Sequence, residues 1–123
     1  MPKQIIIQNN NRNIDSPAQI KYCDTFASQL RGFTFHSRLL PTEGLLLVGT
    51  RDSRLDSAIH MLFVSFDLAV FWINSDMQVV DKVLAKSWRP AYFSKQPARY
   101  VLEIHPERLG EFEIGDTVEF QDV

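Results

Sequence analysis

An uninterrupted apolar run, Leu-Ala-Val-Phe-Trp-Ile at Leu68–Ile73, restricts the fold of this chain more than any other feature. The run is far shorter than the about 20 residues that a helix needs to cross a bilayer. Side chains of a strand point alternately to its two faces, so a strand that is apolar throughout must be covered on both faces. The run therefore predicts a central strand of a sheet, with protein packed against each side.

Shorter β-type segments before and after this run predict a sheet of seven or eight strands. The turn Asn74-Ser75-Asp76 should return the chain as a hairpin. The other expected strands are residues 3–8, 18–22, 45–48, 78–84, 100–104 and 117–120, with a short extended piece at 58–61. The second of them is expected to pair with the first in antiparallel fashion. Residues 49–56 and 86–98 are expected to be loops.

One helix is expected, at residues 24–32. Asp24 can cap its first turn by accepting from backbone N–H groups, and Gly32 suits the left-handed residue that ends a helix. A single further helical turn is expected at residues 106–109, where Gly110 stops it. The expected fold class is α+β and mostly β: a small barrel or sandwich that occupies residues 1–123 as a single domain.

The charges of the chain nearly balance, but they are unevenly distributed. Thirteen Lys and Arg residues face fifteen Asp and Glu residues, for a net charge of −2. General nucleic-acid binding is therefore disfavoured, because phosphate affinity needs a clustered positive excess. Residues 103–123 hold seven of the acids and one base, Arg108, which predicts two solvated faces of different charge.

The single cysteine and the first residues suggest where the protein resides. Cys23 has no partner for an intrachain disulfide, and only Ile5, Ile6 and Ile7 form an apolar stretch near the start. No signal-peptide core is recognisable there. These features favour a soluble protein of the reducing cytoplasm that has no membrane partner. The oligomeric state cannot be predicted from this sequence.

Five groups of residues occur along the chain in a characteristic order. They are Arg31-Gly32-Phe33-Thr34 with Arg38 and Glu43-Gly44-Leu45-Leu46, then Ser57-Ala58-Ile59-His60 with Phe63-Val64-Ser65-Phe66, then Trp88-Arg89, Ala98-Arg99-Tyr100-Val101-Leu102-Glu103 and Gly115-Asp116-Thr117-Val118. This ordered set, over about residues 19–120, resembles the DUF192 family, a domain of unknown function. The resemblance implies a small β-rich domain with one helix near the start, and it supplies no agreed activity.

The chain departs from the family pattern at its centre. Asp67-Leu68-Ala69 stands where the family usually shows Pro-Ile-Asp, and Ser65 replaces an Arg. The acid therefore lies two residues early. Residues two apart on an extended strand share a face, so Asp67 could reach the region that the family's acid serves. His105-Pro106 similarly replaces the family's Ala-Gly.

His60 and Asp67 are the candidate catalytic residues. A histidine can act as a general base near neutral pH, and Asp67 could orient it as in a small hydrolase. The apolar neighbours Ile59 and Met61 favour another interpretation, a core histidine bonded to a backbone carbonyl. In that case replacement of His60 would reduce stability. The sequence contains no complete catalytic set, so it does not decide whether the protein is an enzyme.

Bases and aromatic residues alternate over residues 82–99. The bases are Lys82, Lys86, Arg89, Lys95 and Arg99, and the rings are Trp88, Tyr92 and Phe93. Positive charge with stacking rings suits a small anionic ligand or a single-stranded nucleic acid. The alternative is a loop whose rings close the open end of a barrel. Our leading hypothesis is a binding module with a groove near His60, Asp67 and the loop 88–93, in which Trp88, Arg89, Tyr92 and Arg31 bind the ligand.

No metal or cofactor is predicted. The candidate ligands His36, His60, His105 and Cys23 show no metal-ligand spacing, and the chain lacks a nucleophile elbow and a glycine-rich phosphate loop. Cys23 is expected to be buried and inert. Glu103 lies within an apolar strand, where burial of an unpaired charge is costly, so Arg99 or Arg31 is its expected partner.

Overall fold

The computed structural model describes residues 3–24 and 38–123, which form one seven-stranded sheet and one short 3-10 helix. The expected helix at residues 24–32 and the side chains of Arg31 and His36 lie outside the described residues. The elements are β1 (Gln4–Asn9), β2 (Gln19–Cys23), β3 (Glu43–Ser53), β4 (Leu68–Ile73), β5 (Val79–Ala85), β6 (Ala98–Ile104), η1 (Pro106–Glu111) and β7 (Val118–Asp122). Their order across the sheet is β5-β4-β6-β3-β2-β1-β7, and the pairing is antiparallel except between β2 and β3.

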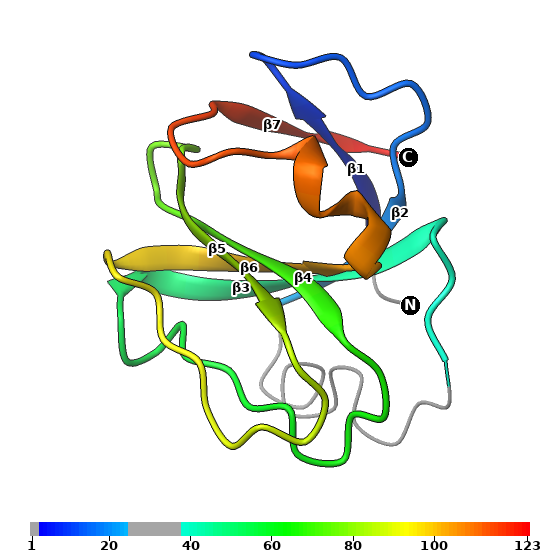
Figure 1. Ribbon diagram of the computed structural model, residues 1–123. Coiled ribbons are helices and arrows are strands. Elements are labelled where there is room, and N and C mark those ends of the chain that lie inside the picture. The colour runs from blue at the N-terminus through cyan, green and yellow to red at the C-terminus, as the bar shows by residue number, and fades with distance from the viewer. Residues whose placement is uncertain (1–2, 25–37) are drawn as a thin grey trace.

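The sheet curls until its two edge strands meet near one end. The N–H of Val79 donates to the carbonyl of Asp116 over 2.8 Å, and the N–H of Val118 donates to the carbonyl of Met77 over 2.9 Å. These bonds join the start of β5 to the start of β7, so the sheet forms a curled half-barrel (Figure 1). The mostly β fold predicted from the sequence is confirmed.

Two apolar cores lie on the two faces of the middle strands. Phe71 and Leu102 belong to the inner core, which the curled sheet encloses, whereas their neighbours Val70 and Val101 belong to the outer core. All six residues of β4 are buried, which confirms a central strand covered on both faces. In Figure 1, β1, β7 and η1 lie on the inner side, and the loops around residues 54–67 and 86–97 lie on the outer side.

Two element boundaries differ from those expected. Residues 49–53 were expected to be a loop, but they extend β3 as far as Ser53, which pairs with Ala98 after an irregularity that follows Val48. Residues 49–53 have the polar composition of a loop because this part of the strand is largely exposed. The helical turn at Pro106 continues past Gly110 to Glu111. Within the described residues, no helix has the length and apolar character needed to cross a membrane.

Candidate functional site

Two loops on the outer side of the sheet are joined backbone to backbone. Ile59 and Tyr92 exchange N–H to carbonyl bonds of 3.0 and 2.8 Å. The N–H of Met61 donates to Arg89 over 2.9 Å, and the N–H of Trp88 donates to Met61 over 2.8 Å. Residues 58–67 and 86–93 therefore form one surface, which we call the loop face. The inward side chains of Ile59, Met61 and Tyr92 anchor it to the outer core.

Each loop contains a tight turn with an unusual residue at its third position. The N–H of Val64 donates to the carbonyl of Met61, and the N–H of Arg89 donates to that of Lys86. The third residues of these turns are Phe63, with φ 63°, and Trp88, with φ 66°. A positive φ at this position favours glycine or asparagine. For a residue with a side chain the left-handed conformation costs roughly 1–2 kcal/mol, so both turns carry strain.

The two strained residues present their rings together. The ring centroids of Phe63 and Trp88 are 5.1 Å apart, with an edge-to-face angle of 63°. Phe63 is 48% exposed and Trp88 is 53% exposed. Met77 also has a positive φ, but its side chain packs against the inner core, which offsets the strain. Neither the Phe63 ring nor the Trp88 ring is part of the two cores formed by the described residues.

The charged groups around the rings are mainly positive. Residues 57–66 and 86–99 contain no Asp or Glu. The guanidinium of Arg89 lies over the ring of Tyr92, 5.7 Å from its centroid, and the backbone N–H of Lys86 donates to the Tyr92 hydroxyl over 2.7 Å. These contacts hold the guanidinium of Arg89 over Tyr92, and Arg89 follows Trp88 in the sequence. The loop face thus combines exposed aromatic surface with positive charge.

Asp67 binds the first residues of the second segment of the loop face, residues 86–93. Its Oδ1 accepts from the N–H of Ser87 over 2.9 Å, and its Oδ2 lies 3.4 Å from Nζ of Lys86. Both oxygens are therefore engaged, and no His60–Asp67 hydrogen bond is found between described residues. The expected catalytic pair is not formed in this arrangement. Asp67 instead fixes the loop that carries Trp88.

His60 is exposed, so the expectation of a core histidine bonded to a backbone carbonyl is wrong. Its neighbours Ile59 and Met61 are buried, at 7% and 0% exposure. Side chains in an extended segment alternate between faces, so two inward neighbours direct His60 outward. Apolar flanks are therefore not evidence of burial when the segment is extended.

The structure brings most of the predicted site residues onto one surface. His60, Asp67, Trp88, Arg89 and Tyr92 all belong to the loop face. Phe63 was missed as a site residue, because nothing in the sequence marks a phenylalanine for a positive φ. In the part of the chain that the structure describes, no group of three His, Cys, Asp or Glu residues could hold a metal.

Lys82 does not join the basic loop with which its sequence position groups it. Its Nζ lies 2.6 Å from a carboxylate oxygen of Glu113 and donates to the carbonyls of Leu109 and Phe112. These partners belong to η1 and the residues that follow it, on the inner side of the sheet (Figure 1). Lys82 is thus an anchor for the C-terminal segment.

Glu103 is a buried carboxyl group on the outer face of β6. It pairs in register with Leu45 and Val70, which are both buried in the outer core. Burial raises its pKa from 4.5 to about 7. The expected partner Arg99 lies elsewhere, because its Nε donates to the carbonyl of Gly49 over 3.0 Å. Cys23 is buried, as expected.

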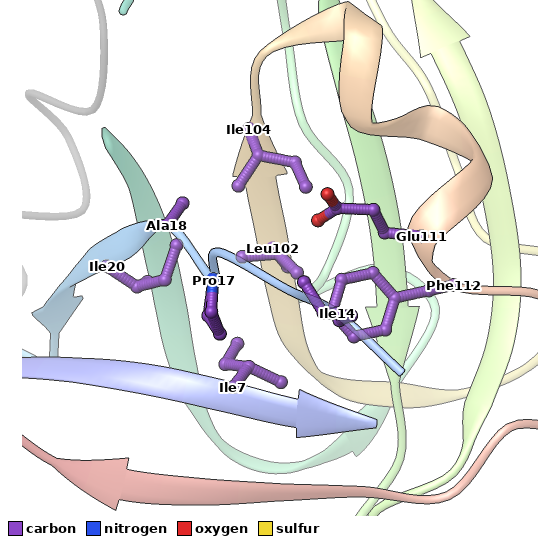
Figure 2. Close-up of a pocket in the computed structure, with 9 residues that line it drawn as sticks. All are labelled: Ile7, Ile14, Pro17, Ala18, Ile20, Leu102, Ile104, Glu111 and Phe112. Carbon is purple, nitrogen blue, oxygen red and sulfur yellow. The ribbon is translucent and has the colours of Figure 1, made fainter. Parts of the chain in front are cut away.

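A small pocket opens into the inner core, on the side of the sheet opposite the loop face (Figure 2). Apolar side chains from β1, β2 and β6 face Phe112 across it, and the Glu111 carboxylate, which is paired with Arg108, lies at its rim. Its free space is about that of a single water molecule. This pocket is too small for a substrate, so the loop face is the better candidate site.

Comparison with known proteins agrees with this fold. The model of the DUF192 family, described as uncharacterized ACR, matches residues 6–120. A UPF0127 protein of Thermococcus gammatolerans is 37% identical over 84 residues, which cover 68% of this chain and 53% of that protein. The UPF0127 protein PH1112 of Pyrococcus horikoshii is 28% identical over 118 residues and is covered to 98%. The chain therefore spans only about half of the Thermococcus relative but nearly all of the Pyrococcus one.

Solved structures show the same architecture. A Sinorhizobium meliloti protein described as a candidate transcription regulator superposes with a TM-score of 0.81 at 18% identity, over 98% of this chain and 94% of its own. A Novosphingobium aromaticivorans protein of unknown function superposes with a TM-score of 0.76 at 20% identity, over 94% of this chain and 83% of its own. At these identities the likeness concerns the fold alone.

Proposed function

Since this chain belongs to the DUF192 family, whose description assigns no activity, we propose a function from the site itself: the loop face binds an anionic ligand that carries a planar ring. The observation that carries the proposal is the exposed ring pair of Phe63 and Trp88 in two glycine-like turns. Strained residues persist where the surrounding structure enforces them, and they cluster at ligand-binding sites. Two such residues in contact support a shared role for their rings.

The charges indicate what the rings would bind. A planar group can stack on the exposed face of Trp88, and the adjacent guanidinium of Arg89 can pair with a carboxylate or phosphate. His60 and Lys86 add further positive or polar groups at the edge of the same surface. The proposal requires no catalytic step, in keeping with the engagement of Asp67 by Ser87 and Lys86.

NMR titration with 2-naphthoate tests the proposal, and neutral 2-naphthol is the matched ligand control. We expect 2-naphthoate to shift the indole signal of Trp88 and the backbone signals of residues 60–64. Trp72 is an internal reference, because its buried indole donates to the carbonyl of Ser57 over 2.8 Å. 2-Naphthol should bind more weakly because it lacks the carboxylate.

Two variants locate the binding. Trp88→Gly keeps a residue suited to φ 66° and removes only the ring, so it should fold and lose the shifts of residues 60–64. Arg89→Gln should weaken binding of 2-naphthoate but not of 2-naphthol. Ile114→Ala and Arg51→Gln, at exposed positions outside the loop face, are controls that should bind as the wild type does. Equal shifts in Trp88→Gly and the wild type would refute the proposal.

We further propose that the protein resides in the cytoplasm. The sequence contains a single cysteine, Cys23, which is buried, and such sparing use of cysteine suits a reducing compartment. Fractionation of cells that produce the full-length protein tests this location. Recovery with exported proteins would contradict it.

A further inference from the structure

The charges of the molecule are separated between its two sides. Six of the seven acids of residues 103–123 lie on η1, β7 and the connection between them, elements on the inner side of the curled sheet (Figure 1), and the seventh, Glu103, is buried on β6. The loop face, on the outer side, carries Arg89 and also Lys86, which is paired with Asp67, and Lys95 follows two residues after its end. Although the net charge of the chain is −2, the loop face and the residues that follow it carry a local excess of positive charge. Such a surface attracts a polyanion even when the whole chain is weakly acidic.

Exposed rings and bases alternate along the second loop of the loop face. Trp88 is 53% exposed and Phe93 is 52% exposed, and Arg89 lies between them in the sequence. Tyr92 lies between the same two rings but packs inward. Two exposed rings in one loop, with cations near them in the sequence, form a track for a chain-like ligand more readily than a single pocket. A ligand that uses the whole track must itself repeat planar and anionic groups.

We infer that the ligand of the loop face is a short stretch of single-stranded nucleic acid, whose bases stack on Trp88 and Phe93 while Arg89 and Lys95 contact its phosphates. This inference rests on the proposed function and names its ligand class. Every base has a flat aromatic face, so stacking on protein rings tolerates different sequences. A double helix keeps its bases stacked on one another, and the rings would then have nothing to stack on.

Fluorescence anisotropy with labelled oligothymidylate and oligouridylate of about six nucleotides tests the inference. We expect binding to the wild type that weakens as salt rises. The slope of log K against log[salt] should be about −1.4, since two phosphate contacts to a single strand each contribute about −0.7. Trp88→Gly should weaken binding about tenfold or more. Ile114→Ala should bind as the wild type does.

The competing outcomes separate this inference from the function on which it rests. If oligonucleotides fail to bind and 2-naphthoate still binds the loop face, the ligand is a small planar anion, and only the nucleic-acid inference is overturned. If neither binds, both are overturned. A duplex of the same length that binds as tightly as the single strand, or a Trp88→Gly protein that binds oligonucleotides normally, would also overturn the inference.

Discussion

Replacement of Glu103 with Gln should make this protein more stable at neutral pH and should flatten the dependence of its stability on pH. Glu103 lies between Leu45 and Val70 on the outer face of the sheet, and burial raises its pKa from 4.5 to about 7. At pH values below 4.5 the carboxyl group is protonated in both the folded and the unfolded chain, so its ionisation costs nothing. As pH rises the unfolded chain ionises first, which favours unfolding.

The size of the effect follows from the two pKa values. Between pH 4.5 and about 7, stability falls by about 1.4 kcal/mol for each pH unit, and above that range it levels off. The total loss is about 3 kcal/mol, a large share of the 5–15 kcal/mol that is typical of a domain. Glutamine resembles the protonated acid in shape and stays neutral, so the Gln variant should avoid this loss.

Urea unfolding of both proteins between pH 4 and pH 8, followed by tryptophan fluorescence, measures the difference. We expect the two free energies of unfolding to be similar near pH 4.5 and to differ by about 3 kcal/mol at pH 8, with the variant more stable. Glu119→Gln, at an exposed position on β7, is the matched control and should follow the wild type. A difference that stays constant from pH 5 to pH 8 would refute the reasoning.

Three further changes test other parts of the structure. Gly44→Ala would place a Cβ 2.5 Å from Cγ2 of Ile104 and 2.8 Å from the carbonyl oxygen of Glu103. Urea unfolding of this variant should therefore show a free energy of unfolding that is lower by about 3 kcal/mol. Gly110→Ala is the control and should show no such loss, because the space around Gly110 is open. His60→Ala should change the free energy of unfolding by no more than about 0.5 kcal/mol, because His60 is exposed. A larger loss would show that the His60 side chain is buried in solution. Burial alone would raise the pKa of Asp116, but hydrogen bonds from Arg12, Asn9 and the N–H of Glu113 lower this pKa to about 2. The contribution of the Asp116 carboxylate to stability is therefore present above pH 3.8 and is lost as pH falls through about 2. Asp116→Asn should remove that part of the acid unfolding transition.

The regular part of the sheet could be predicted because its sequence signals are local. The run Leu68–Ile73 matches β4 at both ends, since an apolar segment between polar turns has few other uses. The antiparallel pairing of β1 with β2 was also predicted and is confirmed. The parallel pairing of β2 with β3 was not predicted, because it depends on the path of the intervening chain. Residues 49–53 were assigned to a loop because an exposed strand end has the composition of a loop.

The candidate site could be predicted only in part. The grouping of Trp88, Arg89 and Tyr92 followed from their nearness in the sequence, and His60 joins them through the pairing of Ile59 with Tyr92. The strained turns at Phe63 and Trp88 could not be predicted, because a left-handed backbone usually shows itself through glycine or asparagine. The prediction that His60 is buried failed because its buried neighbours Ile59 and Met61 were taken as its surroundings. In an extended segment successive side chains point to opposite faces, so these neighbours lie on the other face.

The pairing of β1 with β7 has a consequence for how the protein is made. Ile5 lies opposite Asp122 in the finished sheet, so the first strand of this sheet to be synthesised pairs with the last strand of the sheet. Until synthesis has passed β7, β1 exposes one row of backbone groups and lacks half of its neighbours. Contacts this distant in sequence slow folding and leave strand edges open to other chains. A nascent chain stalled before residue 118 should therefore need a chaperone more than the completed protein does.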